Sequence, residues 1–360
     1  MKEFIKEILI ENFNDDYEAI YHHSPLLQYL DGKMGAIYGN SKSRRNLANI
    51  YAIYAILYFY CENDYGNKID EYKNFEGFDY MSLFSFYRKL YGGQKLQNHA
   101  LNSRVNGEFK NKYQDDLIVI SNGKYAIHIN YLLVKISNES YIDIAKICIN
   151  IIEKYIELLK LKDNQLINDI ENLILADSLK LKKERIEVLL DEKSEARIFE
   201  IISYAILKNH YKNIAVYIGF SLEDIQKQYL TLYKTGRTNA NDGGIDFVMR
   251  PLGRFFQVSE VNHYDKYLLD IDKVLHFPIT FVIKSNKSKL EIEQELNDHI
   301  LQKSGGMKTI IDKYRFAIEE VITINELKTY LKDLTQQDIN ELLRDIDIYY
   351  RLELNLLADD

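Results

Sequence analysis

The residues best suited to chemistry lie between positions 242 and 260, where acidic, amide and glycine residues surround a predicted β-hairpin. Two β-prone runs flank Pro251-Leu252-Gly253, a pattern that predicts antiparallel pairing. If the turn is centred between the last two residues of this triplet, Asp246 lies nearly opposite Ser259. The two-residue period of a strand then places Asp246, Gln257 and Ser259 on one face. A carboxylate and an amide oxygen brought together in this way can coordinate Mg²⁺, which prefers oxygen ligands.

The residues around this motif allow a structural and a chemical interpretation. Gly243-Gly244 precedes the first strand, and a glycine pair permits either a simple tight turn or the close approach of a DNA backbone to a metal. In the structural alternative the hairpin is solvated and its polar side chains face water. The residues expected to form the core on the opposite face are Ile245, Phe247, Met249, Phe256 and Val258.

The stretch resembles the catalytic core of a nuclease superfamily. Residues 242–246, the hairpin and Phe256-Gln257-Val258, followed by a predicted helix and an apolar strand, are similar to the PD-(D/E)XK nucleases in their Mrr-like form, with glutamine in place of the second acid. This resemblance covers about residues 195–284. Residues 95–102, 234–246 and 253–258 are similar to type II restriction endonucleases of the ApaLI-like family.

The resemblance implies an α/β (α+β) fold with a mixed sheet flanked by helices, a largely helical N-terminal region and a helical C-terminal extension. It also implies that Asp246 binds Mg²⁺ and that Gln257 holds the position of the second ligand. Glu200, on the predicted helix before the first core strand, is expected to be a third metal ligand. The same site is expected to include Ser259 and Glu260.

The sequence departs from the superfamily pattern at Ser259, where a lysine is usual. Serine cannot supply the ammonium that would orient the attacking water and offset phosphate charge. Glu260 could reach the metal after a β-bulge, or Lys266 or Lys284 could supply the charge. A second Mg²⁺ could replace the ammonium, or the site could be inactive.

Basic and amide residues are predicted to contact DNA in three places. Lys234, Arg237, Arg250 and Arg254 cluster around the hairpin and are candidates for phosphate contacts, with solvated loop charges as the alternative. Lys42 and Arg44 lie beside serines that can cap a helix, and a helix N-terminus favours anions.

The third place is the very polar segment 94–106. On a helix Asn98 and Asn102 are neighbours at positions i and i+4. Amide side chains can pair with adenine and arginine with guanine, so Gln97, Asn98, Asn102 and Arg104 are predicted to read bases. A plain polar connector is the alternative.

Composition and charge limit the class of protein. The 360 residues are 46% hydrophobic and 28% charged, which is typical of folded proteins with a sizeable core. The net charge of -8 excludes nucleic-acid binding through bulk positive charge, so any DNA contact must be local. Cys61 and Cys148 have no zinc-site spacing. No secretion signal or membrane-spanning segment is found, so we expect a cytoplasmic protein with no membrane partner.

The predicted organisation has four parts. Residues 1–135 form a mainly helical recognition region with a β-hairpin at Asn122-Gly123, and residues 136–192 form a helical connector or dimerisation layer. Residues 193–290 form the core, and residues 291–360 form C-terminal helices. Two of these could be a helix-turn-helix around Leu334-Thr335, or an α-hairpin that closes the domain. Within the core, helices are predicted over 195–208, 221–233 and 263–275, and strands over 213–218 and 279–284.

The resemblance therefore predicts a Mg²⁺-dependent, type II-like restriction endonuclease that hydrolyses phosphodiester bonds in double-stranded DNA. A palindromic target implies a homodimer. A cognate DNA methyltransferase is expected as a neighbouring gene and not as a subunit. The alternatives are a catalytically inactive DNA-binding module on the same fold and a DNA-processing nuclease without sequence preference.

Overall fold

The computed structural model divides into two compact units, Met1–Gln165 and Leu166–Asp360. The boundary falls within one long helix, α10 (Ala145–Leu175). The structure describes residues 1–38, 46–94, 96–135, 140–236, 244–260, 264–354 and 356.

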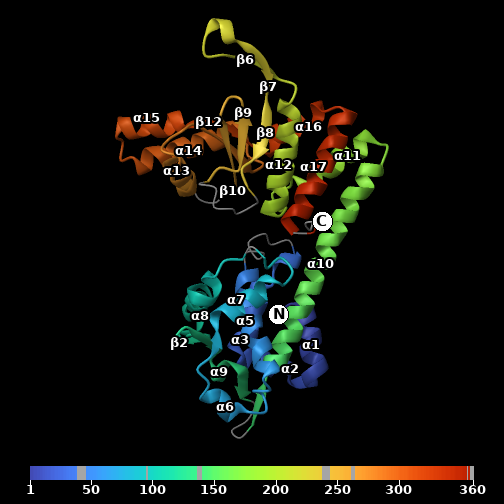
Figure 1. Cartoon of the computed structure of the whole chain (residues 1–360), viewed down its shortest axis with the longest axis vertical. Coiled ribbons are helices and arrows are strands. Elements are labelled where there is room, and N and C mark those ends of the chain that lie inside the picture. The colour runs from blue at the N-terminus through green and yellow to red at the C-terminus, as the bar shows by residue number, and fades with distance from the viewer. Residues whose placement is uncertain are drawn as a thin grey trace. The chain divides into compact units, whose positions relative to one another are not determined.

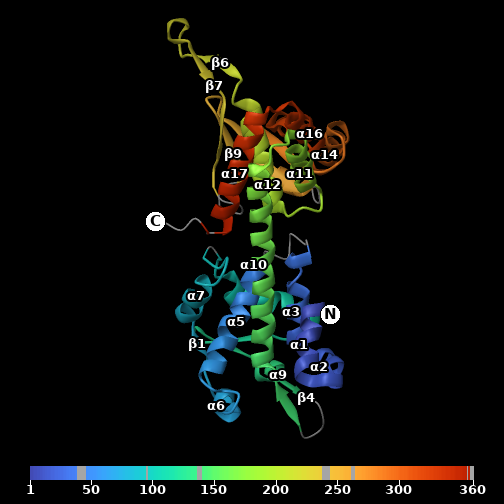
Figure 2. The same ribbon diagram turned by 90° about the vertical axis from the view of Figure 1, so that its right-hand side faces the viewer.

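The first unit is built around α5 (Leu47–Glu62), which lies at the centre of the unit in Figures 1 and 2. Its side chains are apolar on nearly all sides and most are buried, as expected of a helix that other elements surround. The helices around it are α1 (Glu3–Phe13), α2 (Tyr17–His23), α3 (Pro25–Lys33), α6 (Ile69–Lys73), α7 (Tyr80–Arg88), α8 (Val105–Tyr113), α9 (Ile129–Leu132) and the first part of α10. Short helical turns are Asn14–Asp16, Ala36–Tyr38 and Ala100–Arg104.

Two small sheets complete the first unit. The predicted hairpin is confirmed, because β2 (Ile118–Ser121) pairs with β3 (Lys124–Ile127) around Asn122-Gly123, whose φ angles are 49° and 74°. β1 (Phe78–Asp79) pairs with the other edge of β3. The prediction of helix from Tyr141 onward is wrong for its first residues, because β5 (Tyr141–Asp143) pairs with β4 (Leu133–Lys135).

The second unit contains a five-stranded mixed sheet with strand order β12-β11-β10-β9-β8. β9 pairs antiparallel with β8 on one side and with β10 on the other, whereas β11 pairs parallel with both β10 and β12. The strands are β8 (Thr231–Lys234), β9 (Phe247–Arg250), β10 (Arg254–Glu260), β11 (Ile279–Lys284) and β12 (Ile318–Ile322). A separate antiparallel pair, β6 (Ala215–Ile218) and β7 (Gln226–Tyr229), extends beyond this sheet (Figure 2).

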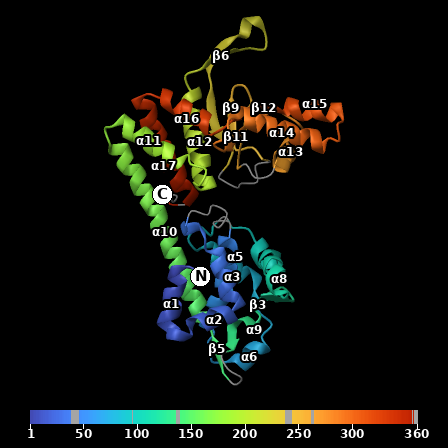
Figure 3. The same cartoon turned by 180° about the vertical axis from the view of Figure 1, so that it is seen from behind.

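Helices cover both faces of this sheet (Figures 1 and 3). On one face the Tyr204 ring of α12 contacts Phe247 of β9. On the other face the Tyr267 ring of α13 contacts Phe281 of β11. The helices of this unit are α11 (Leu179–Leu189), α12 (Ala196–Tyr211), α13 (Tyr264–Lys273), α14 (Lys289–Lys303), α15 (Lys308–Ala317), α16 (Ile324–Asp333) and α17 (Gln336–Leu354). The fold is thus mixed α+β with a helical N-terminal part, as predicted at that level.

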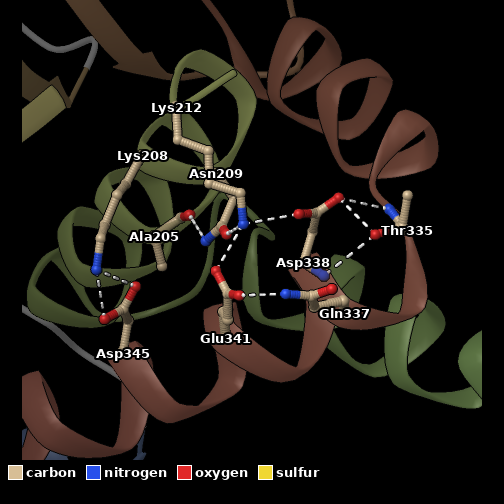
Figure 4. Close-up of polar contacts among 9 residues, drawn as sticks. All are labelled: Ala205, Lys208, Asn209, Lys212, Thr335, Gln337, Asp338, Glu341 and Asp345. Atoms are coloured by element: carbon tan, nitrogen blue, oxygen red, sulfur yellow. Dashed lines mark hydrogen bonds and ion pairs between the residues drawn. The ribbon is translucent and has the colours of Figure 1, made fainter. Parts of the chain in front are cut away.

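Ion pairs join α12 to α17, as Figure 4 shows. Lys208 lies 2.8 Å from Asp345, and Lys212 lies 2.7 Å from Asp338 and 2.6 Å from Glu341. α16 and α17 meet at Leu334-Thr335, and both pack against α12. This packing agrees with an α-hairpin that closes the domain.

Two sequence predictions for this unit are wrong. The helix expected over 221–233 is replaced by a short helical turn (Leu222–Asp224), β7 and β8, because these residues pair with β6 and β9. The C-terminal region expected to be entirely helical also contributes β12, which pairs with β11. Within the ranges that the structure describes, no helix has the length and apolar character needed to cross a membrane.

Candidate functional site

The ends of several strands meet at one end of the five-stranded sheet. β8, β10 and β11 end there, with Lys234, Glu260 and Lys284, and β9 begins there, just after Asp246. Ligand sites of α/β proteins commonly lie at the carboxyl ends of parallel strands. Several of the predicted site residues lie at this end of the sheet.

The hairpin register brings Asp246 beside Gln257. The last pair of the hairpin is Phe247 with Phe256, so the residue opposite Asp246 is Gln257 and not Ser259 as predicted. The predicted turn centre is thus wrong by one residue. Since the register changes by two residues, the side of the sheet on which each side chain lies does not change.

The Asp246 carboxylate lies at the open edge of β10, where the pairing with β9 has ended. Its Oδ2 accepts a hydrogen bond from the backbone N–H of Val258 at 2.7 Å. Its own N–H donates to the carbonyl of Phe256 at 2.9 Å, and its carbonyl accepts from the N–H of Thr235 at 3.0 Å. These contacts from two neighbouring segments fix the carboxylate without burying it completely.

Gln257 presents a buried oxygen for which the structure offers no donor. Gln257 is only 6% exposed, and its Nε2 donates a hydrogen bond to the carbonyl of Val258 at 3.2 Å. Among the described residues, Oε1 has no hydrogen-bond partner. A buried acceptor without a donor costs about 1–3 kcal/mol, and such atoms are often explained by an ion or a water. Gln257 and Asp246 therefore fit a hard cation.

Ser259 lies on the same face as Gln257, under α13. In the parallel pairing of β10 with β11, Gln257 stands beside Phe281 and Ser259 beside Ile283. Both of these β11 residues belong to the core cluster that includes Tyr267 of α13. Ser259 is only 4% exposed. The position of the usual lysine is thus an interior position in this protein.

Two lysine–carboxylate pairs occupy the opposite, α12-covered face. Lys234 lies 2.5 Å from Glu200, and their side chains are 6% and 9% exposed. Lys284 lies 2.5 Å from Glu260 and also donates to the carbonyl of Ser194 at 2.8 Å. Glu200 and Gln257 therefore approach this end of the sheet from opposite faces, with Asp246 at the edge between them.

The remaining predicted cations of the hairpin differ in exposure. Arg250 is exposed and lies over the Tyr233 ring at 6.0 Å. Arg254 donates to Thr280 at 2.9 Å and forms ion pairs with Glu319 and Glu320, so its charge is largely satisfied within the chain. Arg237 lies outside the described residues.

In the first unit, the predicted recognition residues flank the start of a helix. Regular helix in the segment 94–106 begins only after Asn98. The N–H of Asn102 nevertheless donates to the carbonyl of Asn98 at 3.3 Å, so the two are neighbours along the chain's first helical turn. Gln97 and Asn102 are exposed, while Arg104 pairs with Glu108 at 3.1 Å.

Two predicted phosphate contacts, Lys42 and Arg44, lie outside the described residues. Sequence reasoning missed Asp270 of α13, which is only 1% exposed, because an aspartate in an amphipathic helix usually faces water. In the described part of the chain, no group of three or more His, Cys, Asp or Glu side chains is placed to hold a metal ion.

Comparisons with known proteins identify no relative. The chain matches no family model, no curated protein and no solved structure.

Proposed function

We propose that the protein is a Mg²⁺-dependent endonuclease of the type II restriction kind, which hydrolyses phosphodiester bonds in double-stranded DNA. The observation that carries this proposal is the Asp246 carboxylate held by the N–H of Val258 opposite Gln257, whose buried Oε1 has no hydrogen-bond partner among the described residues. The element order supports it, because α12, the β9–β10 hairpin, α13 and β11 occur in the order that the nuclease resemblance implies, with β6, β7 and β8 between α12 and the hairpin.

Asp246 and Gln257 would hold the Mg²⁺. When bound, Mg²⁺ lowers the pKa of a bound water and stabilises charge that develops on the scissile phosphate. The backbone N–H of Val258 orients the Asp246 carboxylate at the edge of the sheet. The carboxamide of Gln257 is oriented by its own hydrogen bond to the carbonyl of Val258.

Lys284 is the best candidate for the ammonium that Ser259 cannot supply. It ends the strand next to β10, and its buried ammonium is held by Glu260 and the carbonyl of Ser194. Lys266, the other lysine considered, is exposed on α13. In this assignment Lys284 offsets phosphate charge, and Glu260 is a positioning residue for Lys284.

Double-stranded DNA is the proposed partner, with Arg250 as an exposed phosphate contact and a homodimer as the assembly that a palindromic site requires. A cytoplasmic location and a neighbouring methyltransferase gene belong to the same proposal. The buried Ser259 favours one rival, a catalytically inactive DNA-binding module.

The test is digestion of unmethylated phage DNA with and without Mg²⁺. We expect discrete fragments that require Mg²⁺, and a loss of at least about 100-fold in cleavage rate for Asp246→Asn, which removes the charge but keeps an acceptor for Val258. Asp298→Asn, an exposed position on α14, is the matched control and should cut normally.

The other results separate the alternatives. Intact DNA that the wild type still binds would mean an inactive binding module, and an unbroken smear would mean a nuclease without sequence preference. If cleavage is seen, Lys284→Met should reduce it while Lys284→Arg retains part of it. Equal cleavage by wild type and Lys284→Met would remove Lys284 from the site.

A further inference from the structure

A second buried oxygen without a donor lies on the α13-covered face. Asp270 is 1% exposed, and its Oδ1 accepts a hydrogen bond from the ammonium of Lys273 at 2.7 Å. Within the described residues, its Oδ2 has no hydrogen-bond partner. Burying part of a carboxylate without compensation is costly, so this oxygen calls for a ligand that the protein chain itself does not provide.

Asp270 packs directly over the start of the candidate site. A Cβ placed on Gly244 would lie 3.1 Å from Oδ1 and 3.5 Å from Cγ of Asp270. Gly244 has φ +89°, which favours glycine, and stands two residues before Asp246. The glycine therefore allows the Asp270 carboxylate to approach the chain that carries Asp246.

Tyr267, on the same helix, packs on this face of the sheet. It lies one helical turn before Asp270, and its ring contacts Phe281, the β11 residue beside Gln257, with centroids 5.0 Å apart. Among the described residues, the buried hydroxyls of Tyr267 and Ser259 also have no hydrogen-bond partner.

We propose that Oδ2 of Asp270 is a third oxygen ligand for the divalent cation held by Asp246 and Gln257. The donor set is then two carboxylates and one amide, all oxygen ligands, which suits Mg²⁺ or Mn²⁺ and balances a double positive charge. This inference rests on the proposed nuclease function for the choice of metal. It differs from the set predicted from the sequence, because α13 and not α12 supplies the additional carboxylate.

The test measures Mn²⁺ binding to the full chain without DNA, by electron paramagnetic resonance of the free ion, and the melting temperature of the metal-free protein. Asp270→Asn should bind Mn²⁺ at least about tenfold more weakly than wild type. Its metal-free melting temperature should equal or exceed that of wild type, because a buried amide costs less than a buried carboxylate. Asp298→Asn, which removes an exposed carboxylate of α14, is the matched control, with unchanged Mn²⁺ affinity.

The inference would be overturned if the wild type bound no Mn²⁺ at millimolar concentration, or if wild type and Asp270→Asn bound Mn²⁺ with equal affinity. It would also be overturned if Asp270→Asn had a lower metal-free melting temperature than wild type, because Asp270 would then be a structural residue. The nuclease proposal is judged separately. If the wild type binds Mn²⁺ through Asp270 but leaves DNA intact, the ligand assignment holds and the nuclease proposal fails. If DNA is cut but Asp270→Asn binds Mn²⁺ normally, the reverse is true.

Discussion

The buried pair of Glu200 and Lys234 allows a prediction that separates a structural from a functional role of Glu200. Their side chains are 9% and 6% exposed, and the two charges lie 2.5 Å apart. Replacing one partner of a buried pair leaves an uncompensated charge and costs about 3–5 kcal/mol. We expect about 3 kcal/mol for Glu200→Leu, the low end, because neither side chain is completely buried. For a unit of this size that lowers the melting temperature by roughly 6–12 °C.

The double variant Glu200→Leu/Lys234→Met is expected to recover most of this loss, because two apolar side chains leave no buried charge. Thermal and urea denaturation of wild type, both single variants and the double variant form a double-mutant cycle. Glu184→Leu is the matched control, since its pair with Lys180 is 59% and 87% exposed and should contribute less than about 0.5 kcal/mol.

Two outcomes would refute this reasoning: a Glu200→Leu variant within about 1 kcal/mol of wild type, or a double variant less stable than either single variant. The same proteins report on function. If Glu200 also serves the proposed metal site, the double variant should regain stability without regaining DNA cleavage. Regained cleavage would show that Glu200 only holds the fold.

Two further predictions concern stability. The His210 ring stacks on Tyr330 with centroids 3.9 Å apart, and burial lowers the pKa of His210 below 6.5. The unfolded chain therefore binds a proton at His210 more readily than the folded protein does. The free energy of unfolding should for this reason fall as the pH drops below about 6.5. His210→Phe keeps the stacking, and its urea midpoint should lose this part of the change between pH 7.5 and 5.5. Gly93→Ala should lower the melting temperature strongly, because its Cβ would lie 2.2 Å from the Tyr87 carbonyl oxygen. In Gly107→Ala, within α8, the added Cβ meets nothing within 4 Å, so this variant should raise the free energy of unfolding by about 0.5–1 kcal/mol.

Elements with strong local signals were predictable from the sequence. The apolar residues of α5 recur at helical spacing, and Asn122-Gly123 favours a tight hairpin turn whatever surrounds it. α13 and the fully buried β11 were also expected close to where they occur. In each case the sequence pattern within one segment is enough to determine the structure.

Elements that depend on distant partners were not predictable. The apolar spacing over 221–233 fits a helix, but β7 pairs with β6 and β8 pairs with β9, so tertiary pairing outweighs local preference. β12 is a short segment between two charged helices, and its place beside β11 depends on how α14 and α15 connect the two strands. Such pairings cannot be read from one segment.

The candidate site likewise has a part that was predictable from the sequence and a part that was not. The sequence motif was enough to select Asp246 and Gln257, and the alternation of a strand was enough to place them on one side. The burial of Asp270, whose Oδ2 has no hydrogen-bond partner among the described residues, depends on how α13 packs against Gly244, and the burial of Lys284 depends on β11 lying beside β10. Neither fact is visible in the spacing of the residues.

The serine at position 259 is consistent with this packing. A lysine there would project from the face that α13 covers, where Ser259 is only 4% exposed and stands beside Ile283 of the core cluster that includes Tyr267. A lysine side chain is much longer than a serine side chain and would have to displace part of this core. Lys284 ends the adjacent strand on the opposite face, where Glu260 and the Ser194 carbonyl hold it. A positive charge is therefore present at the same end of the sheet without occupying the α13-covered face.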